Sequence, residues 1–178
     1  FAADMRGAAK AGWVEAALKS MCQGSGAAAT TLSSFGATAA TDVTGFGLLG
    51  HLVEMAKASE VDVALDLYAV PLLAGAEEIV RRGIFSSLQP QNVRLSRAVA
   101  NHAAAAAHER YSLLYDPQTA GGLLASVPLH KAQECVEALR RAGYPSTAVI
   151  GEVLEGCPGA DGAHQNVMIR TRQPSMDI

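Results

Sequence analysis

The chain has 178 residues and a net charge of −3, with 49% hydrophobic and 17% charged residues. This composition predicts a globular domain with a sizeable buried core and excludes a disordered chain. The slightly acidic balance gives no electrostatic basis for binding nucleic acid or an anionic membrane surface. No apolar run reaches the roughly 18 residues that a membrane-spanning helix needs. We therefore expect neither nucleic acid nor a membrane among its partners.

The chain begins at Phe1 rather than at a methionine and shows no signal-peptide pattern, so we expect a piece of a longer protein. Its three cysteines are an odd number without CxxC spacing, which argues against a disulfide framework and against a zinc site. We interpret Cys135 as a core residue, Cys22 as a free structural thiol and Cys157 as a loop residue. A reducing, cytoplasmic setting fits all three.

The first half of the chain alternates helical and strand patterns. The spacing of apolar residues predicts helices over 4–22, 27–35 and 46–58, and strands over 37–44 and 61–67. The helix over 46–58 is apolar on most sides, which predicts that it is buried. Pro71 is expected to open a further helix that ends near Arg82, with Gly83 as its cap.

The second half of the chain continues this alternation. A polar loop is predicted over 83–92, a helix over 93–108, a short strand over 111–115 and a turn over 116–119. The patterns that follow predict a strand over 121–127, an amphipathic helix over 130–141 and strands over 147–154 and 167–171. Strands separated by helices predict an α/β or α+β domain, with a mixed or mainly antiparallel sheet flanked by helices and a split βαβ unit after Pro128.

The run TDVTGFGLLGH, from Thr41 to His51, has the layout of a strand, a tight glycine turn and a helix start. Such a turn can present backbone N–H groups and a helix N-terminus to an anion. Asp42 is placed to hold the cation that accompanies a phosphate. A capping or turn role is the alternative for Asp42, but this residue precedes the helix by several residues, which favours the ligand role.

The glycines of this run do not identify a nucleotide site by themselves. Gly45 and Gly47 match neither the P-loop nor the dinucleotide-binding fingerprint. A purely structural turn and a phosphate contact therefore both stay open. His51 and Glu54 share one helix face, and without a third ligand a polar stripe or an interdomain contact is favoured over a metal pair.

A second run, DPQTAGGLL, repeats the order of acid, hydroxyl and glycines with Asp116, Thr119, Gly121 and Gly122. An ordinary Asp-Pro turn is the slightly favoured interpretation. The bare backbone at the paired glycines would also suit close approach by a ligand or by another domain.

Both runs closely resemble the C-terminal domain of the selenophosphate synthetase family (selenide, water dikinases), in the aminoimidazole ribonucleotide synthetase superfamily. The likeness extends from Trp13 to Val153 and includes 70–76, Asn92 and 150–153. Ala120 departs from it, because the family usually has serine there, so we assign that position no role. The resemblance implies the C-terminal-domain fold of aminoimidazole ribonucleotide synthetase, partly ferredoxin-like. It further implies that residues 1–178 form a single domain, with a core over 13–154 and a loop and tail over 155–178.

The resemblance also implies a reaction, in which ATP, selenide and water become selenophosphate, orthophosphate and AMP. It implies ATP as substrate, Mg²⁺, a homodimer, and an N-terminal ATP-binding domain that is missing from this sequence and carries the reactive residues. No catalytic residue is then expected here, and the fragment alone should be inactive. Asp42 is implied as a Mg²⁺ ligand at the interdomain cleft, whose further wall residues would be Thr41, Thr44, Gly45, Gly47, Asp116, Thr119, Gly121 and Gly122. Another ATP-dependent member of the superfamily and a non-catalytic module of the same fold remain the alternatives.

Overall fold

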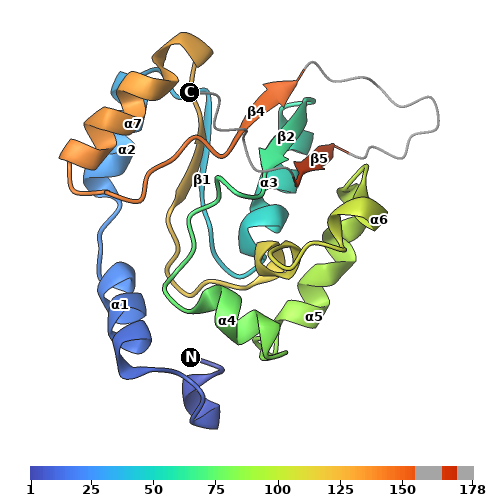
Figure 1. Ribbon diagram of the computed structural model, residues 1–178. Helices are drawn as coiled ribbons and strands as arrows, with labels where there is room; N and C mark the ends of the chain where they lie inside the picture. The colour runs from blue at the N-terminus through green and yellow to red at the C-terminus, as the bar shows by residue number, and fades with distance from the viewer. Residues whose placement is uncertain (155–165, 172–178) are drawn as a thin grey trace, which may run out of the picture.

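In the described part of the chain, two small β-sheets are surrounded by helices (Figure 1). The computed structural model describes residues 1–154 and 166–171. The first sheet pairs β1 (Ala39–Asp42) antiparallel with β3 (Leu123–Ser126). The predicted strands over 37–44 and 121–127 are thus confirmed, with shorter bounds.

The second sheet has the strand order β4–β2–β5. Its central strand β2 (Asp62–Asp66) is antiparallel to β4 (Gly151–Leu154) and parallel to β5 (Val167–Arg170). The predicted class, a mixed sheet with flanking helices, is confirmed. The predicted split βαβ unit is wrong in one respect, because β3 and β4, on either side of the helix that follows Pro128, belong to different sheets.

Seven α-helices and four 3₁₀ helices are found among the described residues. The α-helices are α1 (Ala11–Met21), α2 (Gly26–Ser34), α3 (Gly47–Ala58), α4 (Ala76–Arg81), α5 (Gln89–Asn92), α6 (His102–Ala105) and α7 (Ala132–Arg141). The 3₁₀ helices are η1 (Asp4–Arg6), η2 (Val93–Ala98), η3 (Tyr111–Tyr115) and η4 (Leu129–Lys131). In the described part of the chain, none of the helices has the length and apolar character needed to cross a membrane.

Helix α3 forms the centre of the main core, as its apolar sequence predicts. Leu49, Leu52, Val53 and Ala56 are buried and join a cluster with residues of β2, β5 and η3. Burying one such aliphatic side chain stabilises the fold by about 1.5–3 kcal/mol. Because α3 starts directly after the glycine turn, its packing fixes one end of that turn.

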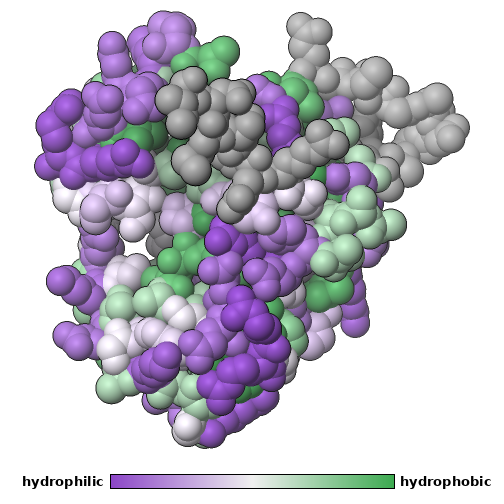
Figure 2. Space-filling model, viewed as in Figure 1, coloured by the Kyte–Doolittle hydropathy of each residue, from purple (hydrophilic) through white to green (hydrophobic). Residues whose placement is uncertain are grey.

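A second core lies between α2, α7 and the β1–β3 sheet. Leu32, Leu139 and Cys135 are buried there, which confirms the core role of this cysteine. The opposite face of α7 is polar, and Figure 2 shows hydrophilic side chains dominating this part of the surface. Cys22 is an exposed free thiol, whereas Cys157 and most of the predicted tail over 155–178 lie outside the described residues.

Two predicted helices of the first half begin later than expected. The helix over 4–22 is divided, because η1 ends at Gly7 with a left-handed φ of 62° and α1 starts only at Ala11. The helix expected from Pro71 starts at Ala76. Gly75 precedes it with a φ of 83°, and a Cβ there would lie 2.2 Å from the Trp13 ring. The Trp13 ring leaves no room for a side chain at position 75, and the left-handed Gly75 directly precedes the first residue of the helix.

The expected polar loop over 83–92 and helix over 93–108 are also partly wrong. The loop ends in one helical turn, α5, and the alanine-rich segment is a 3₁₀ helix and a short α-helix separated by extended backbone. Val99 forms a parallel bridge with Val167, and the Ala100 N–H donates to the Val167 carbonyl at 2.8 Å. Pairing with β5 thus overrides the local helix propensity.

The strand predicted over 111–115 is wrong, because the segment forms η3. Tyr111, Leu114 and Tyr115 are buried, at positions that share one face of a helical turn. Aromatic residues favour strands in general, but this face packs into the core beside α3. The Tyr115 hydroxyl donates to the Tyr111 hydroxyl at 2.5 Å, which satisfies a buried polar group.

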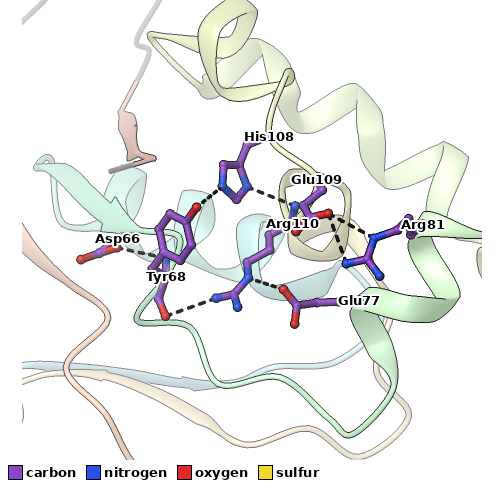
Figure 3. A network of polar contacts seen from close by, with 7 residues as sticks. All are labelled: Asp66, Tyr68, Glu77, Arg81, His108, Glu109 and Arg110. Atoms are coloured by element: carbon purple, nitrogen blue, oxygen red, sulfur yellow. Dashed lines mark hydrogen bonds and ion pairs between the residues drawn. The ribbon is translucent and has the colours of Figure 1, made fainter. Parts of the chain in front are cut away.

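A polar network anchors the start of η3 to α4 and to the segment after β2 (Figure 3). The Arg110 Nε donates to Glu77 Oε1 at 2.5 Å, and the guanidinium lies over the Tyr68 ring, 4.9 Å from its centroid. His108 Nδ1 accepts the Arg110 N–H at 3.2 Å, while its Nε2 lies 2.8 Å from the Tyr68 hydroxyl. These contacts fix the entry into η3, which leads directly to Asp116.

We expect Glu77→Gln to lower the free energy of unfolding by about 1–2 kcal/mol, because a charge-assisted bond to the mostly buried Arg110 is weakened. Glu78→Gln is the matched control, because within residues 1–154 and 166–171 Glu78 pairs only with the exposed Lys10, and its cost should stay below about 0.5 kcal/mol. Urea unfolding of both variants measures the difference. Equal losses would contradict an anchoring role for the Glu77–Arg110 pair.

Candidate functional site

The two acid-, hydroxyl- and glycine-containing runs lie side by side. Asp42, at the end of β1, pairs with Leu123 at the start of β3. The Val43 N–H donates to the Gly122 carbonyl at 2.9 Å, and the Gln118 N–H donates to the Thr44 carbonyl at 3.0 Å. Residues that the sequence places in two separate runs therefore form one surface at this end of the β1–β3 sheet.

Two of the four candidate glycines are required by the close approach of these loops. A Cβ at Gly121 would lie 2.1 Å from the Val43 carbonyl oxygen. A Cβ at Gly47 would lie 2.8 Å from the Leu114 oxygen, and its φ of 69° is also left-handed. Gly45 and Gly122, in contrast, have no heavy atom within 4 Å of a built Cβ. These two leave bare, exposed backbone beside Asp42.

The Asp42 side chain is exposed, and among the described residues it forms no hydrogen bond or ion pair. It does not cap α3, because that helix starts at Gly47 with Phe46 at the N-cap position and no side-chain cap bond. The capping alternative for Asp42 is therefore wrong. Beside it, the Thr41 hydroxyl donates to the Asp42 carbonyl at 3.1 Å, which leaves the carboxylate free.

Asp116 is engaged within its own loop instead. Its Oδ2 accepts a hydrogen bond from the Gln118 Nε2 at 2.9 Å, as expected of a structured Asp-Pro turn. Burial raises the pKa of the Asp116 carboxyl, and the bond from Gln118 opposes that rise. Thr119 is exposed at the tip of the same loop.

Two buried polar side chains hold the turn from inside. His51 Nε2 lies 3.0 Å from the Thr44 nitrogen and 3.2 Å from its hydroxyl, so the histidine serves the turn rather than a metal pair. The Asn92 Nδ2 donates to the Gly45 carbonyl at 2.9 Å and to the Tyr115 carbonyl at 3.0 Å. Asn92 thus links the first run to the end of η3, the residue directly before the second run. Sequence spacing alone predicted this role for neither residue. A histidine on a largely apolar helix does, however, indicate a buried polar group that needs a hydrogen-bond partner.

The donor set around Asp42 fits Mg²⁺ only as part of a larger site. Residues 1–154 and 166–171 contain no group of three His, Cys, Asp or Glu side chains that could hold a metal ion. Mg²⁺ commonly takes one or two protein carboxylates and fills its other positions with water and phosphate oxygens. One free carboxylate beside bare backbone matches such a partial contribution.

The raised pKa of Asp116 predicts a pH-dependent stability difference. As pH rises above the ordinary aspartate range, the unfolded chain ionises first while folded Asp116 keeps its proton, so the free energy of unfolding falls. Asp116→Asn removes this effect. Relative to wild type, the variant should therefore gain stability from acid to neutral pH, measured by urea unfolding in the presence of a chelator. A difference that is constant or shrinks with pH would contradict this.

The glycine contacts predict unequal effects at adjacent positions. Gly121→Ala should lower the free energy of unfolding by about 2–3 kcal/mol, because its methyl group must displace the Val43 carbonyl. Gly122→Ala should change it by less than about 0.5 kcal/mol, since its Cβ meets open space. Thermal or urea unfolding measures both, and a Gly122 variant as damaged as the Gly121 variant would refute the geometry.

Comparison with known proteins identifies the family. Residues 9–160 match the family described as AIR synthase related protein, C-terminal domain. The chain is 39% identical over 130 residues to a selenide, water dikinase of Clostridioides difficile (strain 630), covering 71% of this chain and 36% of that protein. It is also 39% identical over 139 residues to a selenide, water dikinase of Porphyromonas gingivalis (strain ATCC 33277), covering 77% of this chain and 39% of that protein.

A third relative, the selenide, water dikinase of Myxococcus xanthus (strain DK1622), is 39% identical over 127 residues, covering 71% of this chain and 36% of that protein. The chain thus spans little more than a third of the length of these curated relatives. The match to the family nevertheless covers most of the chain, including both runs at the candidate site. The chain belongs to the family of C-terminal domains of AIR synthase related proteins, and the three relatives named above are selenide, water dikinases.

Proposed function

We propose that the chain is the C-terminal domain of a selenide, water dikinase, which makes selenophosphate, orthophosphate and AMP from ATP, selenide and water. The names of its relatives and the resemblance of both runs support this activity for the parent protein. The relatives are nearly three times as long as the matched region, which supports a further domain. In this proposal that preceding domain supplies most of the ATP site and the reactive residues.

The observation that carries the proposal for this domain is the free carboxylate of Asp42. It is exposed at the end of β1, without a partner among the described residues, next to the bare backbone of Gly45 and Gly122. We assign it as one ligand of a Mg²⁺ ion that also binds phosphate oxygens of ATP. The cation would supply charge neutralisation at the phosphates. Thr41, Thr44, Gly47, Asp116, Thr119 and Gly121 form or support the wall around it.

This arrangement gives each part of the wall a distinct task. The β1–β3 pairing and the inner glycines, Gly47 and Gly121, bring the two loops together. The outer glycines, Gly45 and Gly122, let a ligand approach the backbone. Because Asp42 contributes one carboxylate only, metal binding would depend on closure against the preceding domain, which also excludes water. The proposal extends to a homodimeric, cytoplasmic parent enzyme, with no catalytic residue in this domain.

Asp42→Asn in the full-length protein tests the assignment. We expect the Mg²⁺ concentration for half-maximal ATP turnover to rise by about tenfold or more, by analogy with the loss of a metal-site partner. The melting temperature should be unchanged, because the side chain is exposed and has no partner in the part of the chain that the structure describes. AMP is measured by chromatography and selenophosphate by ³¹P NMR.

Glu134→Gln is the matched control, since it removes an exposed carboxylate on α7, away from the site, and should leave turnover as in wild type. An Asp42→Asn enzyme with wild-type Mg²⁺ dependence would refute the metal role. ATP turnover without selenophosphate in the wild-type protein would instead assign it to another ATP-dependent member of the superfamily.

A further inference from the structure

The turn between β1 and α3 is held by a buried imidazole. His51 lies one turn into α3 and is only 7% exposed. Its Nε2 lies 3.0 Å from the Thr44 backbone nitrogen, and a backbone N–H can only donate. Nε2 is therefore the acceptor, and the neutral ring carries its proton on Nδ1, which faces Glu54 Oε2 at 3.7 Å.

Asn92 holds the same turn from a second direction. Its Nδ2 donates to the Gly45 carbonyl, so the peptide groups before Thr44 and after Gly45 are both oriented by buried side chains. In a trans peptide the C=O and N–H point in opposite directions. Aiming the Gly45 carbonyl inward therefore turns the Phe46 N–H away from Asn92, and aiming the Thr44 N–H at His51 turns the Val43 carbonyl toward Gly121.

Packing alone does not account for the histidine. Of its neighbours three and four residues away on the helix, Leu48 and Met55 are apolar and Glu54 is exposed, and a leucine would fill a similar space. A leucine would, however, leave the Thr44 N–H without its acceptor, and an unsatisfied backbone donor drives the turn into another conformation.

We propose that His51 is a positioning residue of the Asp42 site: by accepting the Thr44 N–H, it fixes where the Asp42 carboxylate stands relative to the turn. This rests on the proposed function, because it takes Asp42 as the metal ligand. Only Val43 separates Asp42 from the anchored Thr44 amide, so the carboxylate has little freedom once Thr44 is held. His51 itself contacts neither metal nor substrate in this role.

The test compares His51→Leu with His51→Gln in the full-length protein. A glutamine Oε1 can accept the Thr44 N–H from nearly the same place as Nε2, whereas leucine cannot. We expect His51→Leu to raise the Mg²⁺ concentration for half-maximal ATP turnover about tenfold, and His51→Gln to restore it to within about threefold of wild type. Hydrogen exchange of the peptide that contains Thr44 should be faster in the leucine variant only.

The controls separate this inference from the proposed function. His130→Gln changes an exposed histidine outside the site and should behave as wild type. If Asp42→Asn alters the Mg²⁺ dependence but His51→Leu does not, the positioning role is refuted while the metal role stands. If His51→Leu does not fold, equal Mg²⁺ dependence and equal Thr44 exchange in the glutamine and wild-type proteins support the proposal. A glutamine variant that folds but binds Mg²⁺ tenfold more weakly overturns it.

Discussion

The backbone contact between the two loops is the constraint on which the rest of the site depends. The Val43 carbonyl approaches Gly121 so closely that a single methyl group would collide with it, and Gly47 approaches η3 in the same way. This contact places the end of β1 against the start of β3 and sets the direction in which α3 enters the core. Without it, Asp42 and the loop of Asp116 would be unrelated surface features.

The glycines of the site therefore differ in their physical role. Gly47 and Gly121 lack a side chain because the chain itself fills that space, while Gly45 and Gly122 face no neighbouring atom. The glycine-containing runs include glycines of both kinds, and only the three-dimensional structure shows which glycines have close neighbours. The inner pair belongs to folding, and the outer pair is where a ligand or another domain can meet bare backbone.

The sequence predicted the secondary structure around Asp42 well, because its signals there are local. The strand, turn and helix from Thr41 onward are confirmed, because β-branched residues, glycines and apolar spacing occur in adjacent positions. The strand expected over 111–115 and the helix expected over 93–108 failed because packing beside α3 and pairing with β5 overrode local propensity. Asn92 could not be found by spacing, since its two carbonyl partners lie 47 and 23 residues away.

A single metal ligand contributed by one domain places a demand on rigidity. Where a protein surrounds a cation with several side chains, the others can compensate when one of them moves. In the proposed role Asp42 belongs to no metal-binding group of three or more side chains in the described chain, so its position would have to be fixed before the cation and phosphate arrive. Two buried side chains on the inner side of the turn, and two glycines without neighbours on its outer side, meet this demand. The exposed surface of the site carries few functional side chains for the same reason. The polar side chains His51 and Asn92 lie on the inner side of the turn and bind its backbone.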